Sequence, residues 1–280
     1  MRRPRFGSRL SVAVSRRGPL CVGIDPHPEL LAAWGLDDNP GGLQRFALTC
    51  VQALAGEVAV LKPQSAFFEA YGSRGIAVLE RVIAESRAAG SLVLLDVKRG
   101  DIGSTMAAYA RAYLAEDSPL AADAVTLSPY LGFGSLDPAI ALAAETGRGV
   151  IALAMTSNPE GANVQKALVD NKTTVAQSIV DAVAECNAGV SPLGDVGVVV
   201  GATIGKGQLD LEAVNGPVLA PGFGQQGATV ADLRRVFGPS LRHVIPASSR
   251  DILRHGPDLV ALRSAALRIR DRIVDGTRHR

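Results

Sequence analysis

Ionisable side chains follow short apolar runs at several places in this sequence. The segment Asp96-Val97-Lys98-Arg99-Gly100-Asp101 ends one such run, Asp25 ends another and Lys62 ends a third. Five of the 29 basic residues are lysines, so two lysines at neighbouring run ends are more than ordinary surface charge. Carboxylates with ammonium groups between them can act strongly on a negatively charged substrate. Each residue alone also fits a salt-bridged strand end with Asp101 capping a helix, but the set favours a catalytic site.

Two glycine- and serine-containing segments near the end of the chain could hold a phosphate. Pro221-Gly222-Phe223-Gly224-Gln225-Gln226-Gly227 and Ala247-Ser248-Ser249-Arg250 each follow an apolar run. Glycines let backbone N–H groups approach an anion, and Arg250 near a helix start adds a bidentate donor. A tight turn and a solvated arginine would explain the same residues. Their joint occurrence favours phosphate binding, with Gln226 preferred over Gln225 as a further contact.

A third polar segment, Met155-Thr156-Ser157-Asn158-Pro159, also follows an apolar run. Its hydroxyl and amide groups could bind the edge of a heterocyclic base. A helix cap before a long loop explains it equally well. His27 lies between prolines, and we interpret it as a loop histidine because no partner motif for a general base is visible.

These segments require a scaffold that brings many strand ends together. Short runs rich in β-branched residues alternate with stretches of helical periodicity, which is typical of repeated βα units. Most of the runs are continuously apolar, as in parallel strands buried on both faces. The predicted strands are Leu20 to Ile24, Val58 to Leu61, Leu92 to Asp96, Ala124 to Leu127, Val150 to Ala154, Val196 to Gly201, Pro217 to Ala220 and His243 to Pro246.

Eight strands with intervening helices predict an α/β fold of the closed (β/α)8 TIM-barrel type, in which strand carboxyl ends form the active face. The predicted helices include Gly75 to Ala89, Thr105 to Ala115, Asp137 to Thr146, Thr173 to Cys186, Val230 to Phe237 and Asp258 to Ile273. A doubly wound open sheet is the competitor, but no GxGxxG follows the first strand. Two long connections, Pro26 to Gly56 and Ser157 to Gly194, are expected to be additions or partial lids on the active face.

Composition excludes several other classes of protein. At 280 residues the chain fits one barrel domain, 1–280, and the net charge of +2 is too small for typical nucleic-acid binding. The three cysteines are widely spaced without a CxxC pair, which argues against a disulfide framework or a structural zinc site and favours the cytoplasm. Its apolar runs are shorter than the roughly 20 residues needed to cross a bilayer, so no membrane partner is expected.

The motifs together resemble one known family. Asp96-Val97-Lys98-Arg99-Gly100-Asp101-Ile102 resembles the DxKxxD signature of orotidine 5′-phosphate decarboxylases. Val22-Gly23-Ile24-Asp25-Pro26, Leu61-Lys62-Pro63, Met155-Thr156-Ser157-Asn158 and Pro221-Gly222-Phe223-Gly224 resemble the longer bacterial branch of that family. The likeness extends over nearly the whole chain, and its motifs occur in the expected order on the expected strand ends.

The resemblance implies decarboxylation of orotidine 5′-phosphate to uridine 5′-phosphate in pyrimidine biosynthesis, without metal or organic cofactor. It implies a charged array of Lys62, Asp96, Lys98 and Asp101, with Lys98 as proton donor and Asp101 reaching the partner's site in a homodimer. It further implies the substrate-binding roles of ribose contact for Asp25 and the partner's Thr105, base-pocket lining for Ile102, pyrimidine recognition for Ser157, and phosphate binding for Gln226 and Arg250.

Two other functions remain open on the residues. A magnesium-dependent sugar-phosphate lyase or decarboxylase of the same barrel type would use the acidic residues as metal ligands, but the ammonium groups of Lys62 and Lys98 would repel the ion. A non-catalytic barrel that binds a phosphate ligand is the second, because a fold does not establish activity.

Overall fold

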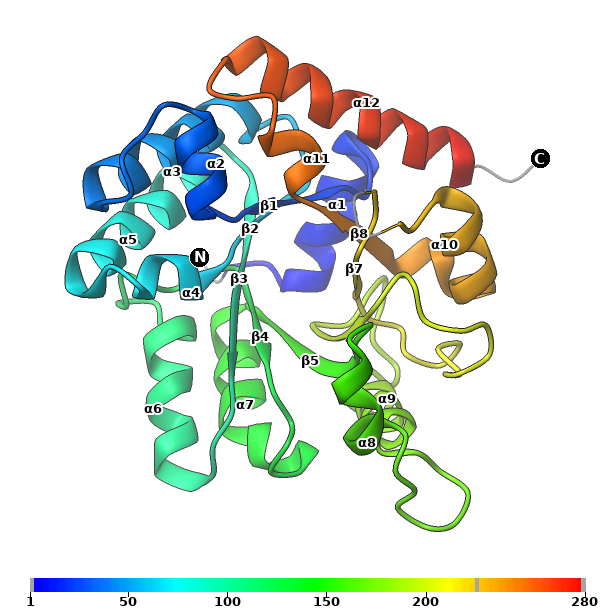
Figure 1. The fold of residues 1–280 in the computed structure, drawn as a ribbon. Helices are drawn as coiled ribbons and strands as arrows, with labels where there is room; N and C mark the ends of the chain where they lie inside the picture. Colours follow the sequence, from blue (N-terminus) through cyan, green and yellow to red (C-terminus); the bar gives the residue numbers. More distant parts are fainter. Residues whose placement is uncertain (1–2, 225–226, 278–280) are drawn as a thin grey trace.

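The computed structural model describes residues 3–224 and 227–277, in which eight parallel strands close into a barrel in chain order (Figure 1). This confirms the (β/α)8 barrel and rules out the doubly wound open sheet. The strands are β1 (Cys21–Ile24), β2 (Val60–Pro63), β3 (Leu92–Arg99), β4 (Ala124–Leu127), β5 (Gly149–Met155), β6 (Val196–Val200), β7 (Val218–Pro221) and β8 (Val244–Ser248).

All eight predicted strands are present, and all except β4 have shifted ends. The second begins two residues later than predicted, and the third continues past Asp96 to Arg99, so that Lys98 lies within it. Most strand residues are buried because helices cover the outside and side chains fill the inside. Every strand contributes to the inner cluster, whose strand residues are Cys21, Val60, Leu94, Ala124, Ile151, Val199, Leu219, Ile245 and Ala247.

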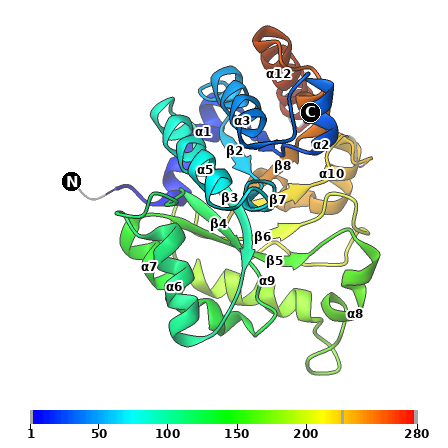
Figure 2. The same ribbon diagram turned by 60° about the vertical axis from the view of Figure 1, so that its left-hand side comes forward.

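Helices surround the barrel (Figures 1 and 2). They are α1 (Phe6–Arg17), α2 (Pro28–Ala33), α3 (Pro40–Leu54), α4 (Ser65–Glu69), α5 (Gly72–Ala88), α6 (Gly103–Leu114), α7 (Asp137–Thr146), α8 (Ala162–Gln165), α9 (Val175–Cys186), α10 (Val230–Phe237), α11 (Arg250–Leu253) and α12 (Leu259–Thr277). Three 3-10 turns accompany them: η1 (Phe133–Leu136), η2 (Pro159–Gly161) and η3 (Gly238–His243). Within the described residues, no helix is both long and apolar enough to cross a membrane.

The two long connections contain ordered elements. The first holds α2 and α3, and Asn39 caps α3 by accepting a hydrogen bond from Gly42 N at 2.9 Å. The second holds η2, α8, a short hairpin in which Leu168 pairs with Thr174, and then α9. Figures 1 and 2 both show α8 and this hairpin projecting from the barrel beside β5.

Helix α1 closes the amino end of the barrel. Its Phe6 and Leu10 side chains are buried in the inner cluster. A side chain at Gly149, the first residue of β5, would lie 2.3 Å from the Phe6 ring, so this position needs glycine. The amino end is thereby filled with apolar side chains, which leaves the carboxyl end for a cavity.

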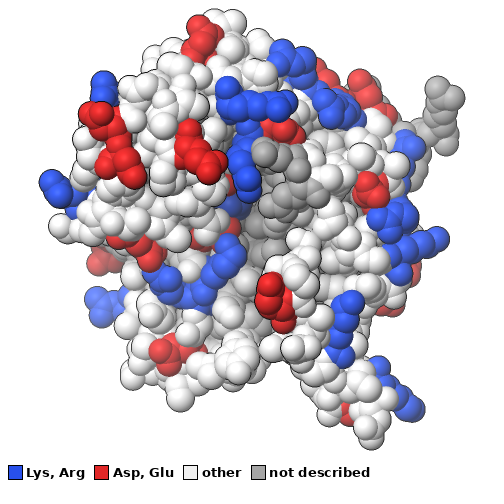
Figure 3. Space-filling model, in the orientation of Figure 1, with Lys and Arg blue, Asp and Glu red and all other residues white. Residues whose placement is uncertain are grey.

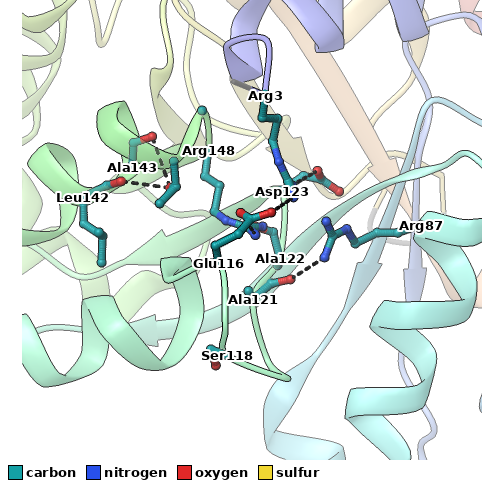
Figure 4. Close-up of polar contacts among 12 residues, drawn as sticks. Arg3, Arg87, Glu116, Ser118, Ala121, Ala122, Asp123, Leu142, Ala143 and Arg148 are labelled. Carbon is teal, nitrogen blue, oxygen red and sulfur yellow. Dashed lines mark hydrogen bonds and ion pairs between the residues drawn. The ribbon is translucent and has the colours of Figure 1, made fainter. Parts of the chain in front are cut away.

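An ion network that includes the buried residues Asp123 and Arg148 lies at the same end (Figure 4). Arg148 is 0% exposed; its guanidinium donates to Glu116 Oε2 at 2.9 Å and to the Ala122 carbonyl. Asp123 forms an ion pair with Arg9 and accepts a hydrogen bond from Val93 N at 3.0 Å. These contacts tie the residues that precede β4 and β5 to neighbouring segments of the chain.

Candidate active site

A cavity of about 290 Å³ lies at the carboxyl ends of the strands, as the fold predicts. Every strand contributes to its lining. The lining includes Asp25, His27, Lys62, Gln64, Asp96, Lys98, Thr126, Thr156, Ser157, Gly201, Gly222, Ser248, Ser249 and Arg250. Figure 3 shows acidic and basic side chains interspersed over the face drawn, in keeping with the small net charge. The cavity, rather than a surface patch, therefore concentrates the chemistry.

Asp96 is the centre of the charged array. Its Oδ2 lies 3.1 Å from Lys62 Nζ, and its Oδ1 lies 2.6 Å from Lys98 Nζ. Asp25 Oδ1 is 4.0 Å from Lys62 Nζ on the other side. The four residues thus alternate in sign across the cavity floor, in the order Asp25, Lys62, Asp96, Lys98. Sequence reasoning predicted these residues, and the fold brings them into contact.

The electrostatic balance keeps this array charged. Burial by itself would raise the pKa of Asp96, but the charges of Lys62 and Lys98 and hydrogen bonds from Lys98 and Thr126 outweigh it and hold that pKa well below its usual range. For Lys62, burial would lower the pKa, but Asp96 and Asp25 outweigh it and raise the pKa. Asp96 is therefore a carboxylate and Lys62 an ammonium at neutral pH.

Two polar residues that the sequence reasoning missed support Asp96. The Thr126 hydroxyl donates to Asp96 Oδ1 at 2.7 Å and accepts from Lys98 N at 3.0 Å. Lys98 has a φ of 49°, in the left-handed region that side chains disfavour, so its backbone needs this support. Gln64 accepts from Lys62 Nζ at 3.3 Å and donates to the Asp96 carbonyl at 3.4 Å. In the sequence, Gln64 follows a predicted strand and Thr126 lies within one, and these positions were the only indication that either residue belongs to the site.

The loops after β7 and β8 form a second polar region of the cavity. Gly222 and Gly224 have φ values of 106° and 88°, which explains the glycines of this loop. The buried Oγ atoms of Ser248 and Ser249 have no hydrogen-bond partner among the described residues. Arg250 begins α11 and is exposed at the cavity edge. Unpaired hydroxyls, a glycine turn and a guanidinium together suit an anion. Gln225 and Gln226 lie outside the described residues.

The segment after β5 forms the side of the cavity between these regions. Thr156 and Ser157 both line it. The Ser157 side chain makes no hydrogen bond within the described part of the chain, whereas both polar groups of Thr156 are engaged by Gln165. His27 also lines the cavity and packs edge-on against Phe67, with ring centroids 4.3 Å apart. His27 thus lies in a loop, as its sequence context indicated, and this loop borders the cavity.

Three predicted site residues lie outside this cavity. Asp101 accepts a hydrogen bond from Ile102 N at 2.7 Å, and Ile102 and Thr105 are exposed at the start of α6. Ile102 is 61% exposed, unusual for an isoleucine beside an active-site rim. The fold therefore unites six of the predicted residues in one cavity and separates these three, with Gln226 outside the described residues.

Comparison with known proteins agrees with this geometry. Residues 18–265 match the model of the orotidine 5′-phosphate decarboxylase / HUMPS family. The chain belongs to this family. It is 64% identical over 264 residues to the orotidine 5′-phosphate decarboxylase of Salinispora arenicola, covering 94% of this chain and 95% of that protein. It is 60% identical to the Streptomyces coelicolor enzyme of the same name, covering 93% and 94% of the two chains.

Solved structures show the same barrel. A Streptomyces avermitilis protein assigned to the same activity has a TM-score of 0.96 and 58% identity, covering 99% of this chain and 97% of that one. The Leishmania donovani OMP decarboxylase has a TM-score of 0.76 and 28% identity, covering 97% and 98%. The family expected from the motifs and the barrel expected from the strand pattern are thus confirmed.

Proposed function

We propose that this chain decarboxylates orotidine 5′-phosphate to uridine 5′-phosphate in the biosynthesis of UMP. The observation that carries the proposal is the Asp25-Lys62-Asp96-Lys98 array facing one cavity, in which Lys62 and Asp96 are buried. The 60–64% identity to decarboxylases of this name supports the same activity. A reaction that removes a carboxylate and leaves charge on a ring carbon is one that such an array can promote.

In the proposed reaction, the bond between C6 of the orotate ring and its carboxylate breaks, and CO2 leaves. The electron pair stays on C6 as a vinyl carbanion, and the Lys98 ammonium gives it a proton to form the product. Asp96 lies against the substrate carboxylate and disfavours the bound ground state, while Lys98 stabilises charge as it moves onto the ring. The 2.6 Å contact between Lys98 Nζ and Asp96 Oδ1 supports this pairing of roles.

The rest of the cavity is assigned to binding. Ser248, Ser249 and Arg250, with Gln226 from the adjoining loop, would hold the 5′-phosphate. Asp25 Oδ1 is buried without a hydrogen-bond partner among the described residues, which suits a ribose hydroxyl donor. Ser157 would bind the pyrimidine edge. Phosphate binding away from C6 supplies energy that orients the ring for reaction.

We also propose a homodimer in which Asp101, Ile102 and Thr105 complete the partner's site. Support comes from exposed apolar side chains on neighbouring loops: Ile102 after β3, and Tyr130 and Leu131 after β4, which are 61%, 77% and 52% exposed. Gly100 packs so closely on Ser128 that the two loops form one surface. Covering that surface with a second copy would bury these side chains.

Mixing two inactive variants tests the composite site. Lys98→Ala and Asp101→Ala would each be inactive alone, but a mixed dimer carries one intact site. Random exchange of subunits should restore roughly one quarter of wild-type activity, because half the dimers are mixed and one of their two sites is intact. No recovery after verified subunit exchange would contradict the shared site.

Decarboxylase activity is tested directly by ultraviolet absorbance during incubation with orotidine 5′-phosphate. The wild-type chain should convert it, and Lys98→Ala should keep nucleotide binding while losing turnover by many orders of magnitude. Near-normal turnover in that variant would refute the proposed proton donor. Binding without turnover in the wild type would favour the non-catalytic barrel.

The metal-dependent lyase is disfavoured by the contacts of Asp96. Both its carboxylate oxygens face lysine ammonium groups, at 3.1 and 2.6 Å, where a divalent ion would need them. We therefore expect turnover to survive EDTA. Loss of turnover in EDTA, with recovery on adding Mg²⁺, would overturn the cofactor-free mechanism.

We further propose that the chain works as a single barrel domain in the cytoplasm, where its cysteines, free in the structure, would stay reduced.

A further inference from the structure

The long connection after β5 holds the strand end that faces the cavity. Gln165, the last residue of α8, uses both ends of its side-chain amide on one residue, Thr156. Gln165 Oε1 accepts from Thr156 N at 2.9 Å, and Gln165 Nε2 donates to Thr156 Oγ1 at 2.7 Å. Thr156 directly precedes Ser157, and both line the cavity. Gln165 itself is not among the described lining residues.

The direction of these hydrogen bonds follows from the chemistry of the groups. A backbone N–H can only donate, so the amide oxygen of Gln165 must face Thr156 N and its NH2 must face the hydroxyl. The hydroxyl then donates onward to Asn158 Oδ1 at 2.6 Å, and Asn158 donates to Glu160 Oε2 at 3.0 Å. Every polar group of the Thr156 side chain and its N–H is used, so Thr156 is fixed while Ser157 remains available.

The strand end needs this support because the sheet no longer provides it. The register between β5 and β6 shifts between Leu153 and Met155. Gly201, the residue that follows β6, donates a backbone hydrogen bond from its N–H to Met155 O at 2.9 Å, at the end of β5. A side chain at Gly201 would lie 3.1 Å from Ser157 N, so the strand end also passes close to the next loop. For Thr156, the residue after Met155, the backbone N–H is bound by the side-chain amide of Gln165 and not by a neighbouring strand.

We infer that Gln165 is a positioning residue for recognition of the pyrimidine base. It acts through Thr156, whose fixed backbone sets the direction of the Ser157 side chain into the cavity. This inference rests on the proposed function, in which Ser157 binds the base. It assigns a role to the 157–194 connection, because Gln165 of α8 fixes the segment after β5 that would contact the base. Gln165 itself contacts neither the charged array nor the loops after β7 and β8 among the described hydrogen bonds.

The test compares a ligand that has the base with one that lacks it. Gln165→Ala removes both hydrogen bonds, and Gln165→Met removes them while keeping the length of the side chain. In both variants, affinity for UMP measured by calorimetry should fall about tenfold, equivalent to about 1.4 kcal/mol. Affinity for ribose 5-phosphate should change less than twofold, since the phosphate loops are untouched. The ratio of the two affinities is a readout that general loosening of the fold would not move.

Gln177 provides a matched control within the same connection. Its side chain also binds one residue twice, donating to Asp210 O at 3.0 Å and accepting from Asp210 N at 2.8 Å, but Asp210 does not line the cavity. Gln177→Ala should leave both affinities unchanged. Equal weakening of UMP and ribose 5-phosphate in the Gln165 variants, or unchanged UMP affinity, would overturn the inference. Failure of the proposed function would appear separately, as wild-type protein that does not decarboxylate orotidine 5′-phosphate.

Discussion

Thr126→Val is the substitution that most directly tests how the charged array is organised. Valine has nearly the same shape as threonine, so the change removes a hydroxyl without opening a large cavity. Thr126 is fully buried, and its hydroxyl serves two residues at once, donating to Asp96 Oδ1 at 2.7 Å and accepting from Lys98 N at 3.0 Å. The variant therefore leaves one carboxylate oxygen with a single partner and one backbone N–H without an acceptor.

The expected magnitude follows from these two bonds. A hydrogen bond to a charged group contributes about 1.5–3 kcal/mol. Lys98 in addition occupies a left-handed conformation, φ 49°, which costs roughly 1–2 kcal/mol and is relieved if its N–H is released. Movement of Lys98 would then weaken its 2.6 Å contact with Asp96. We expect kcat/KM to fall about 10- to 100-fold, since each tenfold step corresponds to about 1.36 kcal/mol.

Initial rates of orotidine 5′-phosphate loss, followed by ultraviolet absorbance, give kcat/KM, and urea unfolding gives the free energy of unfolding. Thr126→Ser keeps the hydroxyl and should retain kcat/KM within about threefold, despite losing a buried methyl group. If Thr126→Val lowers stability but leaves kcat/KM within about twofold of wild type, the hydroxyl supports the fold alone and the positioning argument for Lys98 is wrong.

Three further substitutions test separate parts of the structure. Lys62→Met should destabilise the protein by about 3–5 kcal/mol at pH 7, because it leaves buried Asp96 with one cationic partner. The Asp96 pKa is held well below its usual range in the wild type and rises toward that range in the variant. In urea unfolding, this deficit relative to wild type should therefore stay constant from about pH 7 to about pH 5 and shrink as the pH falls further toward about 2, where the wild type loses the stability that the ionised carboxylate provides. Asp123→Ala should cost about 3 kcal/mol by leaving Arg9 without its buried partner, with kcat unchanged because the cavity is at the other end. Ser248→Ala should raise the free energy of unfolding by about 1–3 kcal/mol, since it removes a buried hydroxyl that has no hydrogen-bond partner among the described residues, yet weaken ribose 5-phosphate binding in calorimetry.

The barrel itself could be predicted from the sequence because burial on both faces leaves continuous apolar strands. β4 is predicted with its observed ends, Ala124–Leu127, since Asp123 and the residues after Leu127 interrupt the run sharply. β3 extends beyond its predicted end, because the prediction stopped where the residues become polar. Lys98 faces the cavity and Arg99 binds Glu69, so neither contributes to the apolar core. Apolar periodicity cannot reveal strand residues whose partners are charges.

The site was predictable where a residue type was unusual for its position. Lysine at the end of an apolar run signals a paired charge, which identified Lys62 and Lys98. Thr126 gave no such signal, because threonine is common in buried strands and its role depends on a contact with Asp96, 30 residues away in the chain. Gln165 lies in a polar loop where glutamine is ordinary. The role of Gln165 depends on side-chain hydrogen bonds to Thr156 within the same connection. Single-sequence patterns contain neither contact.

The two ends of the barrel treat buried polar groups differently, and this difference is what makes one end a binding site. At the amino end, Asp123 and most of the Arg148 guanidinium are paired within the chain, so that end gains its stability on folding. At the carboxyl end, Asp25 Oδ1 and the Ser248 and Ser249 hydroxyls are buried without hydrogen-bond partners among the described residues. Unmet polar groups of this kind cost about 1–3 kcal/mol each. A nucleotide that supplies their partners recovers that energy on binding, far from the carbon that reacts, where it can orient the ring against Asp96 and Lys98.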